Sequence, residues 1–191
     1  MKAIIFQGQK VSRTKVKNNI LKVWGQCTTD DKYDWYAEAR EFAESLDTTL
    51  NKACGIIAAL SPLVNWKRNK TIAELFVNGQ RKGLHTTLCV GKAERILASD
   101  GKDETILAIL NGQKIKSFFI NIRYPNEVQR VTIDRHALSI AIGTKLTDEK
   151  MRITPKQYEF FNHCYMLTAD VLDISPLILQ SATWVRWRKF K

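Results

Sequence analysis

The sequence lacks the features that mark disulfide-rich and membrane-spanning proteins. It has only four cysteines in 191 residues, and no two of them stand in a C-x-x-C or similar spacing. We therefore expect small buried thiols in a reducing compartment, with neither a disulfide framework nor a metal site. No apolar run approaches the length of a membrane span, and residues 1–11 become polar too soon for a secretory signal. We expect a cytoplasmic protein with no membrane partner.

Strand patterns are also scarce, because alternation of apolar and polar residues is not sustained anywhere in the chain. Helical spacing and helix start signals instead predict an all-α protein with eight or nine helices. The clearest start is Thr154-Pro155-Lys156-Gln157, which opens a helix over about residues 155–172 with Thr as N-cap and Gln reaching back to it. Asp103 and Asp134 are expected to cap two further helices.

Positive charge is in excess, with 30 Lys and Arg against 19 Asp and Glu and a net charge of +11. Phosphate contacts and counterion release reward clustered cations, so the balance favours a nucleic acid as partner. A merely basic protein with no such partner has the same composition, and charge alone does not exclude it.

Two ionisable residues stand out in the central stretch over residues 107–142. Lys116 follows a predicted hairpin at Asn111-Gly112 and lies among apolar residues, and burial there would favour its neutral amine. Asp134 opens the next helix, where the dipole and the free N–H groups favour a carboxylate. Together they could supply an amine nucleophile and an acid/base partner. The alternatives are a solvated lysine and a carboxylate that only caps its helix.

The sequence around these two residues resembles the motifs of a known family. Residues 110–118, LNGQKIKSF, and residues 133–136, IDRH, are similar to the motifs of the helix-hairpin-helix DNA glycosylases, the superfamily of endonuclease III. The lysine, the aspartate, their separation and the trailing histidine all match. Residues 56–76 and 92–97 resemble the family's segments upstream of the hairpin, so the likeness covers roughly residues 50–143.

The resemblance implies a single domain over residues 1–191, built as two helical lobes around a central helix-hairpin-helix with a DNA-binding cleft between them. One lobe would hold about residues 48–143, and the other about 1–47 and 144–191. The partner would be double-stranded DNA with one nucleotide flipped out, bound by a monomer. The family's iron–sulfur cluster is not expected, because its closely spaced cysteines are missing. The likeness leaves room for a monovalent cation at the hairpin and for no other cofactor.

The resemblance also assigns roles to residues. Lys116 would be the Schiff-base nucleophile and Asp134 the catalytic aspartate, with His136 and Ser61 in support. DNA contacts would come from the hairpin and from the loop and helix start that fill the gap left by the flipped base: Gly112, Gln113, Lys114, Asn65, Trp66, Lys67, Arg68 and Asn69. The sequence departs from the pattern at Lys114, where the family has a second hairpin glycine, and a side chain there is expected to restrict the turn.

The predicted function is a DNA base-excision glycosylase with lyase activity through the lysine, acting on a damaged or modified base. Two alternatives stay open. The same fold could modify a base in hypermodified viral DNA, since the C-terminal part resembles a divergent viral branch. It could also bind DNA without catalysis.

Overall fold

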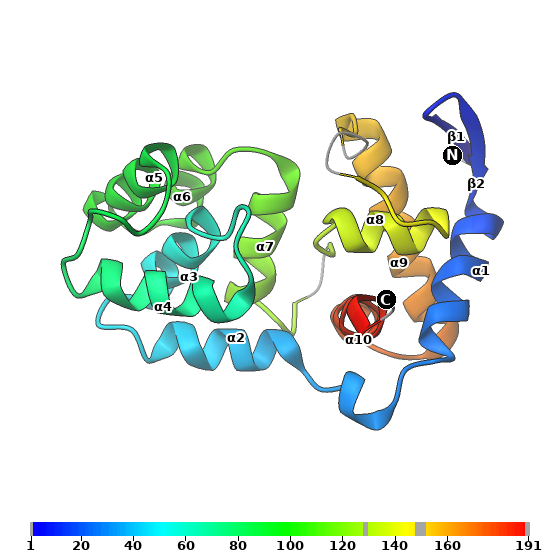
Figure 1. Cartoon of the computed structure of the whole chain (residues 1–191), viewed down its shortest axis with the longest axis horizontal. Coiled ribbons are helices and arrows are strands. Elements are labelled where there is room, and N and C mark those ends of the chain that lie inside the picture. Colours follow the sequence, from blue (N-terminus) through cyan, green and yellow to red (C-terminus); the bar gives the residue numbers. More distant parts are fainter. Residues whose placement is uncertain (1, 128–129, 148–151, 190–191) are drawn as a thin grey trace. The chain divides into compact units, whose positions relative to one another are not determined.

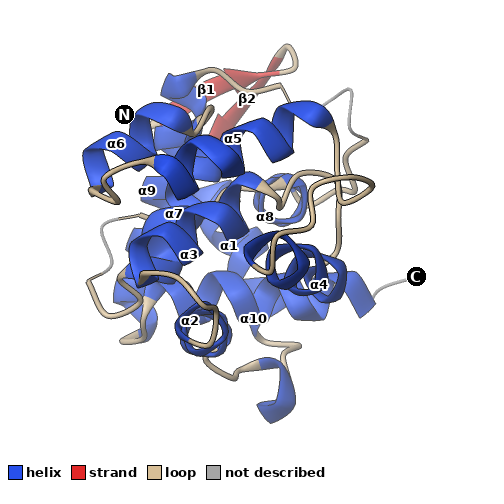
Figure 2. Ribbon diagram, turned by 90° about the vertical axis from the view of Figure 1, so that its left-hand side faces the viewer, coloured by secondary structure: helices blue, strands red, loops and turns tan. Residues whose placement is uncertain are grey.

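Helices make up most of the structure, a computed structural model that describes residues 2–127, 130–147 and 152–189. Ten α-helices, one short 3-10 helix and a two-stranded hairpin occur within these ranges (Figures 1 and 2). The all-α prediction is confirmed, although the helices outnumber the expected eight or nine by at least one and the sequence analysis does not predict the hairpin.

The chain forms two compact units, with Met1–Trp35 and Asn126–Lys191 in unit 1 and Tyr36–Pro125 in unit 2. The boundaries differ from the expected 48 and 143. Residues 126–143 fall in unit 1 because helix α8 (Arg135–Ile142) buries its apolar face in that unit, where it packs against α1 (Arg13–Trp24) and α10 (Pro176–Lys189). Asp134 therefore belongs to unit 1, whereas Lys116 belongs to unit 2.

Unit 1 begins with the hairpin of β1 (Ala3–Phe6) and β2 (Gln9–Ser12). Gln7 and Gly8 connect the strands and both have positive φ, which is typical of the tight two-residue turn that suits twisted strands. Phe6 packs edge-on against Phe161 at 5.8 Å. The helices of the unit are α1, α8, α9 (Pro155–Leu172) and α10, with the 3-10 helix η1 at Thr29–Asp31.

Helix α9 begins as the sequence predicts. The Thr154 hydroxyl accepts from the Gln157 N–H at 3.2 Å, and the Gln157 side chain accepts from the Thr154 N–H at 2.8 Å. Pro155 occupies the first helical position. An N–H at that position has no acceptor within the helix, so its absence in proline costs no hydrogen bond.

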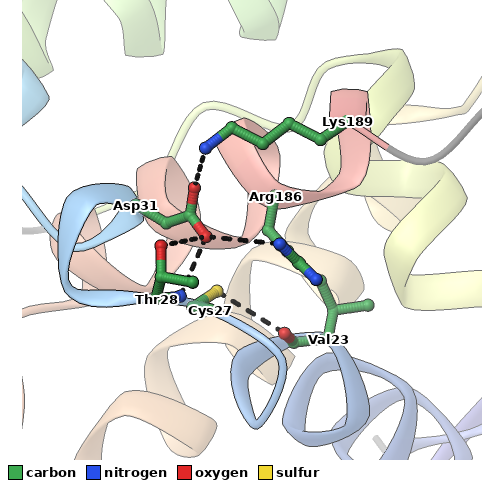
Figure 3. Close-up of polar contacts among 6 residues, drawn as sticks. All are labelled: Val23, Cys27, Thr28, Asp31, Arg186 and Lys189. Atoms are coloured by element: carbon green, nitrogen blue, oxygen red, sulfur yellow. Dashed lines mark hydrogen bonds and ion pairs between the residues drawn. The ribbon is translucent and has the colours of Figure 1, made fainter.

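A buried carboxylate joins η1 to the last helix of unit 1 (Figure 3). Asp31 is 0% exposed, and its oxygens accept from the Thr28 N–H at 2.9 Å and from the Lys189 ammonium at 2.5 Å. Arg186 lies 4.0 Å away as a second cation. Burial by itself raises the pKa of Asp31, but the hydrogen bonds from Lys189 and Thr28 outweigh it and hold the pKa below its ordinary value. Asp31 is therefore ionised at neutral pH and fixes α10.

Unit 2 is built around α3 (Leu50–Ala59), which contacts α4 (Trp66–Val77), α5 (Thr87–Ala98), α6 (Asp103–Ile109) and α7 (Gln113–Arg123), while α2 (Trp35–Glu44) precedes it in the chain. Residues 53–60 are all buried, as expected for a helix that is apolar on every side. Gly55 allows the close approach of neighbouring helices, because a Cβ there would lie 2.9 Å from Ile106 and 3.0 Å from Ile96.

Candidate functional site

The two helices and the short connection that the sequence predicts around Gly112 are present in unit 2 as α6, residues 110–112, and α7. Gly112 has φ of +79° and is the residue that precedes α7. A Cβ added there would meet nothing within 4 Å, so the backbone conformation, and not the space, requires glycine. Lys114 has no positive φ and lies within α7, so the expected restriction of the turn by its side chain does not occur.

A half-buried hydrogen-bond network links the two helices that flank the hairpin. The sequence predicts Asp103 as the cap of α6, but the capping position is Lys102 and Asp103 makes other bonds. Its carboxylate accepts from the Asn51 amide at 2.8 Å and from the Tyr124 hydroxyl at 2.7 Å. Since Tyr124 ends α7, these bonds connect the start of α6 to the end of α7 and to α3.

The start of α7 offers a place for an anion. The first N–H groups of a helix have no acceptor within the helix, and the side-chain-less Gly112 does not cap them. The partial positive charge of the helix end adds to these donors. Lys114 lies in the same turn and is half-buried. The hairpin can therefore hold a phosphate through backbone donors with a cation beside them.

Lys116 lies at the end of the same turn and is half-buried. Its ammonium has no hydrogen-bond or ion-pair partner among the described residues. The following residues of α7 are mainly buried, with Phe119 at 0% exposure. Lys116 thus lies beside buried residues of α7, and its ammonium has no bonding partner among the described residues. This environment is compatible with a nucleophile.

Asp134 is the N-cap of α8, as the sequence predicts. One carboxylate oxygen accepts from the Ala137 N–H at 2.8 Å, and the other accepts from the Trp184 indole N–H at 3.0 Å. The carboxylate is half-buried. Both oxygens are therefore oriented by fixed donors, which leaves each with further lone pairs for a ligand.

The extended segment before Asp134 is held by α9. The Val131 N–H donates to the Asn162 side chain at 2.8 Å, and the Ile133 N–H donates to the Tyr158 hydroxyl at 3.1 Å. The Tyr158 hydroxyl in turn donates to the Val131 carbonyl at 3.2 Å. The chain enters α8 along a path set by two side chains of α9, and this path places Asp134.

Trp184 is the residue of this site that sequence reasoning missed as a partner of Asp134. Its ring packs against Trp35 at 6.2 Å and edge-on against His136 at 6.0 Å, and the guanidinium of Arg188 lies 4.6 Å from the ring centroid. His136 therefore packs against the same tryptophan that donates to Asp134. No local pattern in the sequence connects Trp184 to Asp134, because fifty residues separate them.

Tyr165 lies under the start of α8. It is 0% exposed and its hydroxyl donates to the Ala137 carbonyl at 3.0 Å. Burial raises the pKa of this phenol, and the negative charge of Asp134 raises it further. Tyr165 is thus a neutral donor that supports the first turn of α8.

Side chains of residues 61–69 cap helix α4 and pack against its neighbours. The Ser61 hydroxyl donates to the Ala58 carbonyl at 2.9 Å, and Asn65 caps α4 by accepting from the Arg68 N–H at 2.8 Å. Trp66 packs edge-on against Phe42 at 5.9 Å, with the Lys70 ammonium 5.5 Å from its centroid.

The predicted DNA contact by Asn69 is wrong, whereas Lys67 and Arg68 are accessible to DNA. Asn69 is 2% exposed and donates to the Ile57 carbonyl at 3.1 Å, so it connects α4 to α3 and is too buried to contact DNA. Lys67 and Arg68 are exposed.

The exposed apolar side chains of this region are leucines that sequence reasoning did not select. Leu63 is 92% exposed and Leu88 is 78% exposed. Leu63 also has φ of +61°, a conformation that a branched side chain disfavours. The His85 ring joins the loop of Leu63 to the start of α5, where Leu88 lies, because Nε2 contacts the Pro62 carbonyl at 2.7 Å and Nδ1 accepts from the Thr86 N–H at 2.7 Å.

Comparison with known proteins identifies a family. The sequence matches the family described as "Family of unknown function (DUF7178)" over residues 2–191. The chain belongs to this family. No curated protein and no solved structure matches it.

Three general properties of the described residues concern membrane spans, metal sites and thiols. None of their helices combines the length and the apolar character needed to cross a membrane. No group of three or more His, Cys, Asp and Glu side chains suited to a metal ion occurs within residues 2–127, 130–147 and 152–189. The four cysteines are free thiols.

Proposed function

We propose that the protein is a DNA base-excision glycosylase that acts on a flipped base through Lys116 and Asp134. One observation carries the proposal: a helix-hairpin-helix with an uncommitted lysine in the first turn after the hairpin is followed, eighteen residues later, by an aspartate at a helix start. This is the order and spacing of the glycosylase motif that the sequence resembles.

The proposed grip on DNA uses the start of α7. Its backbone donors and Lys114 would hold a backbone phosphate, and the net charge of +11 would favour the approach of the polyanion. Lys67 and Arg68, both exposed, would add phosphate contacts. Such contacts position the DNA without reading its sequence.

Leu63 and Leu88 supply exposed apolar side chains, which a base-flipping protein needs in addition to positive charge. Proteins that distort a duplex often insert apolar side chains between base steps, and the space left by a flipped base must be filled. An aliphatic side chain that is 92% exposed and held at positive φ is unfavourable in water. We propose that Leu63 fills the space left in the duplex by the flipped base, the role that the sequence predicts for Asn65 and Trp66.

The proposed reaction begins with the neutral amine of Lys116. Its lone pair attacks C1′ of the flipped nucleotide, the bond from C1′ to the base breaks, and the base leaves with the electron pair and takes up a proton. Loss of the amine proton and opening of the sugar ring give an iminium. Loss of a proton from C2′ then expels the 3′ phosphate, which is the lyase step.

The proposed role of Asp134 is electrostatic. Positive charge develops on the sugar as the base leaves, and a fixed carboxylate stabilises that charge. The Trp184 N–H and the Ala137 N–H hold the carboxylate in one orientation before the reaction, so little reorganisation is needed.

Borohydride trapping tests the proposal. The hydride reduces the iminium to a stable amine, so wild-type protein should become covalently attached to DNA that carries an abasic site or the substrate base. Lys116→Ala should not trap, whereas Lys82→Ala, which removes an exposed lysine of the same unit, should trap like the wild type. Equal trapping by Lys116→Ala would remove Lys116 from the mechanism.

Mass spectrometry of the nucleosides after incubation separates the rival functions. A free base with an abasic site supports excision. An altered nucleoside would indicate the base-modification alternative. Salt-sensitive DNA binding with no product from duplexes carrying uracil, oxidised, alkylated or hydroxymethylated bases would indicate a binding protein without catalysis.

A further inference from the structure

Unit 1 contains a cavity of about 230 Å³ between α1 and α9, and none of its lining residues is assigned a role above. Arg13, Thr14, Lys17 and Asn18 line it from α1, and Cys164 and Thr168 are among its lining residues from α9. Arg13 and Lys17 are four residues apart on one helix, so they project from the same face. No Asp or Glu of the described chain lines the cavity, which is therefore positively charged.

Arg13 is a donor without an acceptor. Its Nε is buried and has no hydrogen-bond partner, and neither its guanidinium nor the Lys17 ammonium has an ion-pair partner among the described residues. Buried donors in folded proteins are nearly always satisfied, so an unsatisfied one needs an explanation. A guanidinium presents its donors as a planar fork, which matches the oxygens of a phosphate.

The α9 side of the cavity brings no competing anion. Cys164 is 2% exposed, and burial raises the pKa of its thiol to about 11 although the charge of Arg13 acts in the opposite direction. The thiol is thus neutral at pH 7. Thr168 is 0% exposed and its hydroxyl donates to the Cys164 carbonyl at 2.7 Å, so it adds no charge to the cavity.

We propose that Arg13 and Lys17 bind a phosphate group in this cavity. The volume is below the roughly 300–1,000 Å³ typical of pockets that enclose a whole drug-sized ligand, so a phosphate fits better than a complete cofactor. Two cations match the double charge of a phosphomonoester, and the same donors can also hold the singly charged phosphate of a DNA backbone. This assignment is independent of the proposed glycosylase activity and of Lys116.

Nuclear magnetic resonance of the arginine Nε–Hε groups in the full-length protein tests the assignment with inorganic phosphate as probe. The Arg13 signal, identified by its loss in Arg13→Lys, should move and saturate at millimolar phosphate, and acetate at equal ionic strength should not move it. Lys17→Gln keeps Arg13 as reporter and should weaken binding by about tenfold, the order expected for loss of one charge-assisted contact. Lys15→Gln is the matched control, because Lys15 is an exposed lysine of the same helix that does not line the cavity.

The two sources of phosphate give different results in a second titration. If a short DNA duplex moves the Arg13 signal and added phosphate reverses the change, the group bound is a backbone phosphate. If the duplex leaves the signal unchanged while phosphate moves it, the ligand is a free phosphomonoester. An Arg13 signal that does not respond to phosphate, responds equally to acetate, or loses its response equally in Lys15→Gln and Lys17→Gln would overturn the proposal.

Discussion

Replacing Asp31 with asparagine should destabilise the protein strongly while changing only one buried atom group. The carboxylate is 0% exposed and accepts from Thr28 and Lys189, with Arg186 as a second cation. The substituted side chain could still accept from the Thr28 N–H through its amide oxygen, but its amide nitrogen would place a donor against the Lys189 ammonium. Two cations would then lose their common counter-ion.

The expected loss follows from the contacts. Breaking one partner of a buried ion pair costs about 3–5 kcal/mol. The Lys189 side chain is 54% exposed and can turn to water, so the lower end, about 3 kcal/mol, applies. For a chain of 191 residues, each kcal/mol corresponds to roughly 2–4 °C, so Tm should fall by about 6–12 °C.

Thermal unfolding followed by far-UV circular dichroism measures this loss, with Asp30→Asn as the control. Asp30 is the preceding residue and is exposed, and its replacement changes the net charge by the same amount. The control should therefore stay within about 0.5 kcal/mol of the wild type. The reasoning would be refuted if the two variants unfolded at the same temperature.

Low pH should remove the stabilisation that ionised Asp31 gives to the folded protein. Because the folded pKa of Asp31 lies below its ordinary value of 3.8, its ionised form stabilises the protein fully above that value, and the effect is lost as pH falls through the lower folded pKa. The difference in stability between wild type and Asp31→Asn should therefore be constant from pH 7 to about 5 and shrink below about 4. A difference that stays constant in acid would show that the charge of Asp31 is not the cause.

Three further substitutions test other features. Gly55→Ala should cost about 1–3 kcal/mol by overpacking, because the new Cβ would lie 2.9 Å from Ile106, and urea unfolding measures this. Gly112→Ala should cost about 1–2 kcal/mol for its positive φ and weaken DNA binding in a salt titration, and unchanged values would show that the hairpin tolerates a side chain. Trp184→Phe keeps an aromatic ring but removes the donor to Asp134, so it should lower the trapping rate while Lys116 remains able to trap, and an unchanged rate would mean that the orientation of Asp134 is irrelevant.

The sequence predicts best what is encoded locally. The Thr154-Pro155-Lys156-Gln157 signal places the start of α9 correctly because capping and proline geometry depend on adjacent residues. Asp134 is predicted at a helix start for the same reason. The β-hairpin at the N-terminus is not predicted because four-residue strands are too short for a sustained alternation, although Gln7-Gly8 directly after the apolar residues 3–6 is an available signal.

Contacts between distant residues could not be predicted from one sequence. Asp31 and Lys189 are 158 residues apart, and no local spacing marks them as partners. Asn69 resembles a surface residue in the sequence because it follows two basic residues, yet its position on α4 faces α3. Leu63 resembles an ordinary loop residue, since neither its exposure nor its positive φ is visible in the sequence.

The way α9 holds residues 131–133 has a consequence for how this family can diverge. Asn162 and Tyr158 hydrogen-bond to main-chain groups of residues 131 and 133, so any amino acid other than proline at 131 or 133 offers them the same bond. Pairs of positions that change together across a family reveal contacts between side chains, whereas a bond to the main chain leaves no such record. Positions 158 and 162 should therefore resist replacement individually while covarying with neither 131 nor 133.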